Sequence, residues 1–198
     1  LKFPKNPKIL IEGISGIGKS TLIDIILGLL KLDKGNLLVD GKKIDKKNFI
    51  SWNKNISYLT QETFIIEGNF YQNVALDMNI NDDVKKKVVD CCKISEIHNF
   101  INSKSGKYER MISYSGKDLS NGQKQRLGLA RALFKFPSLL ILDEATNSID
   151  SINEKKIFHN LKKMNNLTLL HISHKKVTHS IYDNKILIKN KKIYLTKI

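Results

Sequence analysis

The sequence predicts an α/β fold in which helices flank a mostly parallel sheet. Apolar strand patterns alternate with helical patterns along much of the 198-residue chain, the order expected of parallel strands joined by helices. Residues 139–142 form a continuous apolar run, which is typical of a strand buried on both faces. A glycine-framed segment, residues 13–21, joins an apolar strand to an apolar helix. The chain is long enough for one domain with a substantial core.

The individual elements follow from local patterns. Apolar residues at 8–11 predict the first strand, and those at 22–30 predict the helix that follows the glycine segment. A strand predicted at 36–41 ends in an Asp40-Gly41 turn. Ser120 is expected to cap a helix that runs to residue 134. We also expect strands at 55–60, 138–142, 167–172, 185–188 and 192–195, and helices at 81–100 and 152–164.

A polar helical stretch from residue 70 to residue 134 interrupts this alternation. We therefore expect one domain over residues 1–198, with a sheet core formed by residues 1–69 and 135–198. Residues 70–134 would form a helical subdomain inserted into that core.

The net charge of +15 suggests nucleic acid as one possible partner. Only three of the 34 basic residues are arginine, however, and the lysines are scattered along the chain. Aromatic residues interleaved with basic ones, as in RNA-binding segments, are absent. We expect a solvated lysine coat and no specific nucleic acid, although an anionic membrane surface nearby could use the charge.

The remaining composition indicates a reduced protein without a membrane span of its own. Cys91 and Cys92 are adjacent in a helical pattern and have no metal-ligand companion nearby. We expect them to be free packing residues in a cytosolic setting. No run of about 20 apolar residues occurs in the chain.

The glycine-framed segment has the strand–loop–helix order of a P-loop NTPase core. Its glycines allow successive backbone N–H groups to face phosphate oxygens, and the following helix adds its positive end. Lys19 would reach the β- and γ-phosphates, and the Ser20 hydroxyl would bind Mg²⁺. The predicted nucleotide-binding residues of the segment are Gly13, Ser15, Gly16, Ile17, Gly18, Lys19, Ser20 and Thr21.

An acidic pair stands at the carboxyl end of the apolar strand 139–142, where ligands bind in open α/β sheets. Asp143 would help to hold Mg²⁺. Glu144 could orient or deprotonate a water that attacks the γ-phosphate. The pair is weak evidence alone and becomes strong in combination with the glycine segment.

A second anion site is predicted where the helix at 120–134 begins, in the sequence Leu-Ser-Asn-Gly-Gln at 119–123. Plain capping by Ser120 is the simpler alternative. The position of this segment, twenty residues before the acidic pair, favours the functional interpretation.

Together these motifs resemble the nucleotide-binding domain of an ATP-binding cassette (ABC) transporter, over essentially the whole chain. Residues 13–20 match the Walker A loop, 119–123 the family signature, and 139–143 Walker B, followed by the catalytic glutamate Glu144. Residues 148–150 resemble the D-loop, Gln61 the Q-loop glutamine, and His174 the switch histidine.

The resemblance implies roles for these residues. ATP and Mg²⁺ would be the cofactors. The catalytic residues would be Glu144, His174 and Gln61, and the metal would be bound by Ser20, Gln61 and Asp143. Ser120, Gly122, Gln123 and Asp150 would complete the nucleotide site across a head-to-tail dimer, formed either by two copies of the chain or with a paired cassette domain.

The resemblance also implies a partner and a location. Residues 62–74 and 115–118 are similar to those of exporter-type domains, which work at the cytoplasmic face of a membrane with a transmembrane domain, commonly in the same polypeptide. The chain would power an exporter through ATP-driven dimerisation. The alternative is a soluble cassette ATPase that acts on nucleic acid or ribosomes, which the charge alone favours. A degenerate partner of a heterodimer is disfavoured by intact Glu144, His174 and Ser120.

Several departures from the family pattern are visible. Asn121 replaces the first glycine of the signature, and we expect it to tolerate an unusual backbone conformation. Thr60 stands where a proline often precedes the glutamine. The aromatic residue that stacks on adenine should lie further upstream than this chain begins, so the first strands of the family fold are expected to be missing.

Overall fold

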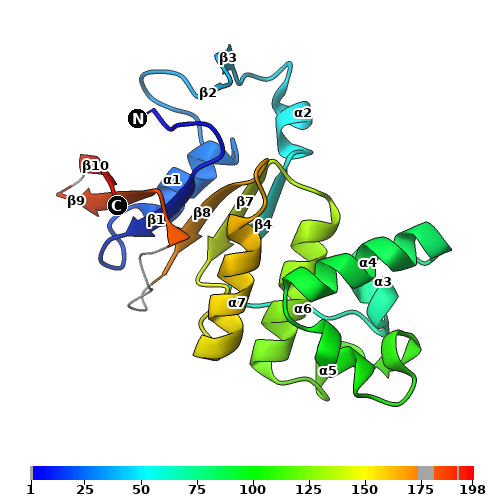
Figure 1. Ribbon diagram of the computed structural model, residues 1–198. Helices are drawn as coiled ribbons and strands as arrows, with labels where there is room; N and C mark the ends of the chain where they lie inside the picture. Colours follow the sequence, from blue (N-terminus) through cyan, green and yellow to red (C-terminus); the bar gives the residue numbers. More distant parts are fainter. Residues whose placement is uncertain (1, 174–180, 191) are drawn as a thin grey trace.

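The computed structural model describes residues 2–173, 181–190 and 192–198, and its centre is a six-stranded sheet (Figure 1). The strand order is β10-β9-β1-β8-β7-β4. All neighbours are parallel except β10, which pairs antiparallel with β9. The strands are β1 (Lys8–Glu12), β4 (Ile56–Leu59), β7 (Leu139–Asp143), β8 (Thr168–Ile172), β9 (Asn184–Lys189) and β10 (Lys192–Lys197). The predicted α/β class and these strands are confirmed.

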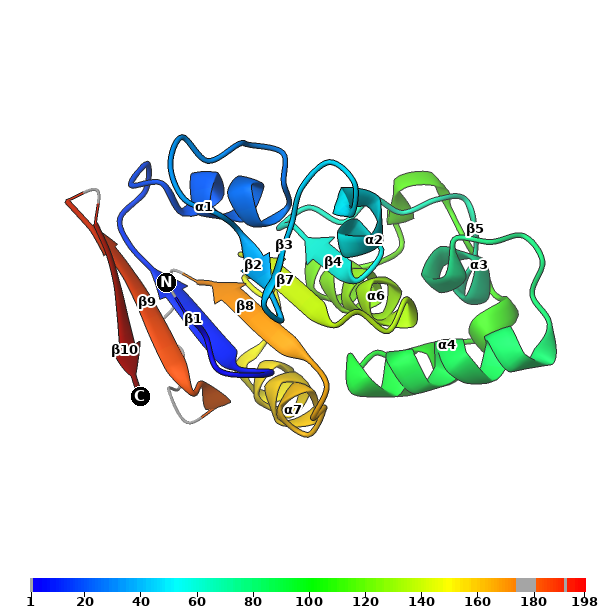
Figure 2. The ribbon, with the colours of Figure 1, turned by 90° about the horizontal axis from the view of Figure 1, so that it is seen from above.

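Helices cover both faces of the sheet, with α1 (Lys19–Ile26) on one face and α7 (Ser151–Lys162) on the other (Figure 2). Alternate residues of β7 supply both cores: Leu139 and Ile141 pack with α1, and Leu140 and Leu142 pack with α7. This burial on both faces explains why the strand is a continuous apolar run.

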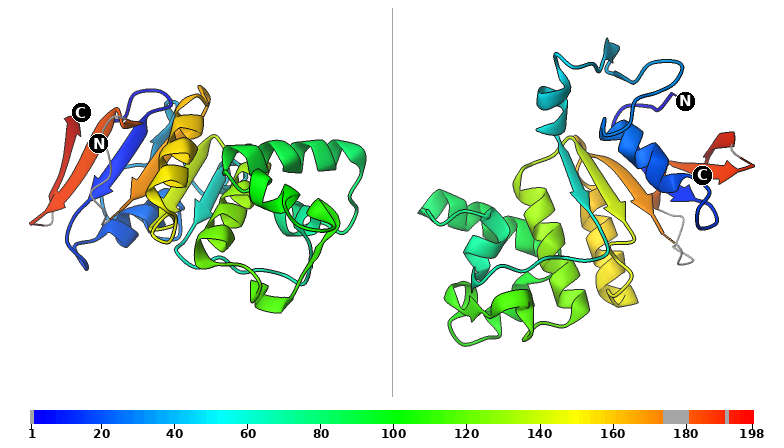
Figure 3. Two further views of the ribbon diagram at one scale, coloured as in Figure 1. Left: turned by 60° about the horizontal axis from the view of Figure 1, so that its bottom comes forward. Right: turned by 180° about the vertical axis from the view of Figure 1, so that it is seen from behind.

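Four helices gather beyond the β4 edge of the sheet, as both views of Figure 3 show. They are α3 (Phe70–Ala75), α4 (Asp82–Ile94), α5 (His98–Asn102) and α6 (Asn121–Phe134). Helix α6 also packs on the sheet, where the Ser57 hydroxyl donates to the Ala132 carbonyl at 2.7 Å. The division at residues 70 and 134 stays a prediction.

The two cysteines are free, buried residues of α4. Burial raises the pKa of the Cys91 thiol to about 11 and that of Cys92 to about 12. Both side chains are therefore protonated and serve as packing residues, as expected.

Helix α1 is shorter than predicted, because it ends at Ile26 rather than at residue 30. Gly28 follows in a left-handed conformation with φ of 71°. Its N–H donates to the Ile25 carbonyl, and the Leu29 N–H donates to the Asp24 carbonyl. These two bonds form a Schellman motif, which satisfies the last carbonyls and stops the helix.

The helix predicted at 81–100 is divided into α4 and α5 by a second left-handed helix termination of the same kind. Glu96 has a left-handed φ of 58°, and the Ile97 N–H donates back to the Cys92 carbonyl at 3.0 Å. A glycine is usual at such a position, so the sequence gives no sign of the break.

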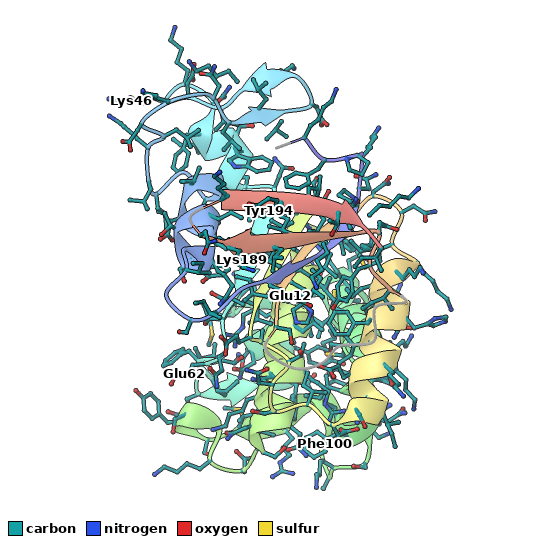
Figure 4. The ribbon with its side chains drawn as sticks, turned by 90° about the vertical axis from the view of Figure 1, so that its left-hand side faces the viewer. Glu12, Lys46, Glu62, Phe100, Lys189 and Tyr194 are labelled. Carbon is teal, nitrogen blue, oxygen red and sulfur yellow. The ribbon has the colours of Figure 1, made fainter. Side chains whose placement is uncertain are left out.

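The strand predicted at 36–41 is instead one arm of a small hairpin, β2 (Leu38–Val39) and β3 (Lys42–Lys43). Asp40 and Gly41 both have positive φ, which is the conformation of a type I′ hairpin turn. The segment that carries this hairpin, which includes Lys46, projects beyond the sheet (Figure 4).

Several short elements were not predicted: α2 (Phe49–Asn53), β5 (Gly68–Asn69), β6 (Met111–Ile112) and two short 3-10 turns at Lys107–Glu109 and Tyr114–Gly116. Within the described residues, no helix has both the length and the apolar character needed to cross a bilayer.

Candidate functional site

The sheet brings the predicted motifs together at the carboxyl ends of its parallel strands. In the register of the parallel strands, Ile11 lies beside Ile172, and Ile172 lies beside Asp143. Leu59 lies beside Leu142. The carboxyl ends of β1, β8, β7 and β4 are therefore neighbours, and so are the segments that follow them. His174 follows β8 in the sequence but lies outside the described residues.

The glycine segment forms an open loop between β1 and α1. Gly16 has φ of 76° and Gly18 has φ of 111°, and open space surrounds the position that a β-carbon would take at either residue. Gly18 occupies the N-cap position of α1, where it provides no side-chain acceptor, and the first turn of the helix has no acidic residue. By contrast, Asn69, Asn81, Ser120 and Asp150 cap their own helices with side chains. The first N–H groups of α1 can thus bind an external anion.

Lys19 places its ammonium group inside this loop. Its Nζ donates to the Gly13 carbonyl at 2.7 Å and to the Ile14 carbonyl at 3.1 Å, and the residue is only 9% exposed. Gly13 is needed for close packing, because a β-carbon there would lie 2.8 Å from Ile17 and 3.1 Å from the Ile188 carbonyl. Ser15, Ser20 and Thr21 are exposed.

Asp143 ends β7 on the face of the sheet that carries α1, since it continues the alternation of Leu139 and Ile141. Tyr58, on the neighbouring strand β4, donates its phenolic hydrogen to Asp143 Oδ2 at 2.9 Å. Burial and this hydrogen bond raise the pKa of Tyr58 well above its usual value, with the charge of Asp24 adding to the effect. The phenol therefore remains a donor and fixes the carboxylate at the carboxyl end of β7.

Glu144 has a strained backbone. Its φ of 55° is left-handed, which costs about 1–3 kcal/mol for a residue other than glycine and is commonly found at functional sites. The Glu144 N–H donates to the Ile172 carbonyl at 3.0 Å. Asn147 Nδ2 donates to Glu144 Oε2 at 3.1 Å. The first bond fixes the backbone of Glu144 next to Asp143, and the second bond orients its carboxylate.

The predicted second anion site begins α6. Ser120 caps the helix by accepting from the Gln123 N–H at 3.3 Å, while Gln123 Oε1 accepts from the Ser120 N–H at 2.9 Å. The simpler interpretation, capping, is thus realised, and the exposed Ser120 hydroxyl keeps its own hydrogen for a further acceptor. Asn121 is an ordinary helical residue. The tolerance expected of asparagine is not needed here, because the backbone at this position is already helical.

The segment 148–150 lies against the start of α6. A β-carbon on Gly122 would lie 2.6 Å from the Ser148 carbonyl oxygen, so only glycine allows this approach. Asp150 caps α7 by accepting from Asn153 N at 3.0 Å and Asn153 Nδ2 at 2.7 Å. Hydrogen bonds from Asn153 lower the pKa of Asp150, so its carboxylate is ionised at neutral pH.

Gln61 is exposed two residues beyond the end of β4. Its backbone carbonyl accepts from Gln125 Nε2 at 3.2 Å. Sequence reasoning missed both Gln125 and Tyr58, because their roles depend on which strands and loops are neighbours.

The oxygen ligands at the carboxyl ends of the strands suit a metal ion that is bound jointly by the protein and a phosphate. No cluster of three or more His, Cys, Asp or Glu side chains suited to a metal occurs in the part of the chain that the structure describes. Mg²⁺ typically binds one or two carboxylates together with phosphate oxygens and waters. Asp143 and the hydroxyl of Ser20 are donors of that kind.

Comparisons with known proteins identify the family of this chain. A family model described as "ABC transporter" matches residues 1–147. The probable microcin-H47 secretion/processing ATP-binding protein of Escherichia coli is 35% identical over 178 residues, which are 90% of this chain and 25% of that protein. The sublancin-168-processing and transport ATP-binding protein of Bacillus subtilis is 33% identical over 189 residues, 96% of this chain and 26% of its own length. A probable ABC transporter ATP-binding/permease protein of Haemophilus influenzae is 34% identical over 182 residues, 91% of this chain and 32% of its own.

The same fold occurs in the solved structure of a bacterial Atm1-family ABC exporter with ATP bound. The TM-score is 0.85 at 24% identity, and the match covers 96% of this chain and 33% of that one. The chain spans about a quarter to a third of the length of these relatives.

Proposed function

This chain belongs to the ABC transporter family, and we propose that it is the ATP-binding and ATP-hydrolysing domain of a membrane exporter. The observation that carries the proposal is the arrangement of residues at the carboxyl ends of the parallel strands. The glycine loop that encloses the Lys19 ammonium follows β1, and Asp143 and Glu144 stand at the same end of β7, two strands away.

Lys19 and the open first turn of α1 would bind the phosphates of ATP. The ammonium now bonds to two carbonyls of its own loop, and it would exchange these for phosphate oxygens. Ser20 and Asp143 would hold Mg²⁺, with Gln61 as a further ligand, and the ion would neutralise charge on the β- and γ-phosphates. Tyr58 would keep the Asp143 carboxylate oriented toward the metal.

Glu144 would act as the general base that orients and deprotonates the attacking water. Its carboxylate must then be released from Asn147 or shared with it. His174 would contact the γ-phosphate, a role that rests on the family resemblance.

The nucleotide site would be completed by a second cassette domain, either another copy of this chain or a paired domain. Ser120 and Asp150 are exposed, and Gly122 holds their two segments together. Ser120, Gly122, Gln123 and Asp150 would face the nucleotide bound to the glycine loop of the partner.

A transmembrane domain would dock on the exposed aromatic surface beyond β4. Phe64 and Tyr114 are 62% and 64% exposed, and their rings meet edge to face at 6.5 Å. Phe64 lines a groove of about 280 Å³ together with Leu76 and Arg131. The relatives named for secretion and transport support an exporter at the cytoplasmic face of a membrane, in one polypeptide with its transmembrane domain.

Replacement of Glu144 by glutamine tests the proposal. The wild-type chain should hydrolyse ATP, and Glu144→Gln should slow hydrolysis by about 10²–10⁴-fold, the contribution of a positioned base. ATP binding should persist, because the glycine loop is unchanged. Phosphate release and binding of a fluorescent ATP analogue measure the two effects separately. Full turnover by Glu144→Gln would refute the assigned base.

A further inference from the structure

Gln125 is a buried polar side chain to which the proposed function assigns no role. It lies in α6, one turn beyond the cap of the helix, and is 3% exposed. A buried amide is costly unless both its donor and its acceptor are satisfied. The partners of this side chain are therefore informative.

The two ends of the Gln125 amide bind two different loops. Nε2 donates to the Gln61 carbonyl at 3.2 Å, and Oε1 accepts from the Ser148 N–H at 2.9 Å. These partners lie 64 and 23 residues away in the sequence. One side chain thus joins the loop after β4 to the loop that contains Asp150.

Helix α6 fixes the first loop at a second point. Arg131 donates to the Phe64 carbonyl at 2.7 Å and to the Asn73 carbonyl at 2.8 Å. Phe64 belongs to the exposed aromatic surface. The backbone of residues 61–64 is thereby attached to α6 at both of its ends.

The second loop, residues 147–150, is bonded to Glu144, the proposed general base. Ser148 follows Asn147, whose side-chain amide donates to Glu144 Oε2 at 3.1 Å. A contiguous series of bonds therefore runs from the Phe64 loop through Gln125 to Glu144. Such a series is a physical route for coupling, which demands a direct test.

We propose that Gln125 is a positioning residue that couples the exposed loop 61–64 to the loop 147–150 and, through it, to Glu144. A partner that displaces the first loop would reorient the second only while the Gln125 amide bridges them. The inference rests on the proposed function for its catalytic consequence, but the bridge itself can be measured without nucleotide.

Two substitutions dissect the bridge. Gln125→Met keeps the length of the side chain and removes both strong hydrogen bonds. Gln125→Glu, with its carboxyl ionised, keeps the acceptor for the Ser148 N–H and removes the donor to the Gln61 carbonyl. Gln72→Met is the matched control, because among the described residues the Gln72 side chain bonds only to Asn69 and Met78, at the two ends of its own helix, and to neither loop of the bridge.

Amide hydrogen exchange of the nucleotide-free chain tests the coupling first. Loss of the acceptor in Gln125→Met should speed exchange at Ser148 about fivefold, the value of one net hydrogen bond. Arg131→Lys, which loosens the Phe64 end, should also speed exchange at Ser148. It should have no further effect at Ser148 when Gln125 is already methionine. Equal effects of Arg131→Lys in both backgrounds would overturn the proposal.

Steady-state hydrolysis tests the consequence. Gln125→Met and Gln125→Glu should both lower kcat by about 10–100-fold, the scale of a small misplacement of a catalytic group. KM for ATP should change less than about twofold, and Gln72→Met should retain wild-type kcat. A wild-type kcat in Gln125→Glu would show that only the Ser148 anchor matters, and would overturn the coupling. An inactive wild-type chain would instead refute the proposed function. The hydrogen-exchange result would still show whether Gln125 couples the two loops.

Discussion

Gly128 allows a quantitative test of how closely α6 packs against the segment after β4. It lies in the middle of α6, where glycine costs about 1 kcal/mol relative to alanine. A β-carbon there would lie 2.6 Å from Thr63 Oγ1 and 2.7 Å from Thr63 Cγ2. Favourable contacts between carbon atoms lie at about 3.5–4.0 Å, so the helix and Thr63 would have to separate.

The magnitude follows from two opposing effects. Gly128→Ala gains about 1 kcal/mol of helix propensity and loses about 1–3 kcal/mol to overpacking. We therefore expect the free energy of unfolding to fall by about 0–2 kcal/mol. Thr63→Ala removes both clashing atoms, together with a buried hydroxyl that has no hydrogen-bond partner among the described atoms.

In the Thr63→Ala background the sign should reverse. The next nearest atom to the new β-carbon is then the end of the Leu59 side chain, at 3.0 Å, and it can rotate away. Gly128→Ala should stabilise this variant by about 0.5–1 kcal/mol. Urea unfolding of the four proteins, with unchanged m-values, measures a coupling energy of about 1–3 kcal/mol. Equal stabilisation in both backgrounds would show that α6 does not pack on Thr63 and would refute the reasoning.

Three further outcomes are expected. Lys19→Ala should abolish binding of a fluorescent ATP analogue, whereas Lys46→Ala, on the projecting segment, should not; unchanged binding by Lys19→Ala would mean that the loop does not hold phosphate. In light scattering, the Glu144→Gln chain should gain mass when ATP is added, and a constant mass would contradict the shared nucleotide site. Burial raises the pKa of Cys92 to about 12 from an ordinary 9.0, so the folded chain holds this proton more tightly than the unfolded chain does. The resulting stability is complete below about pH 9 and is lost as the pH rises toward 12. The decline of the free energy of unfolding between pH 9 and 11 should therefore be shallower in Cys92→Ala, and an unchanged slope would contradict a buried thiol.

Much of the site could be predicted because its signals are local. The strand–loop–helix order around Lys19, the cap at Ser120 and the acids after β7 each depend on residues close together in the sequence. Helix ends were less predictable. Gly28 marks the end of α1, but Glu96 ends α4 in a left-handed conformation that its residue type does not indicate.

The sequence by itself predicted the main strands and helices and the candidate phosphate-binding loop, because hydrogen bonds and burial periodicity within a few residues set these features. Only the tertiary structure decided that Tyr58 meets Asp143 and that Gln125 joins Gln61 to Ser148. These pairs depend on the order and register of the strands and on the docking of α6 against both loops. Local residue patterns do not fix that arrangement, because many pairings would bury the same apolar strands equally well.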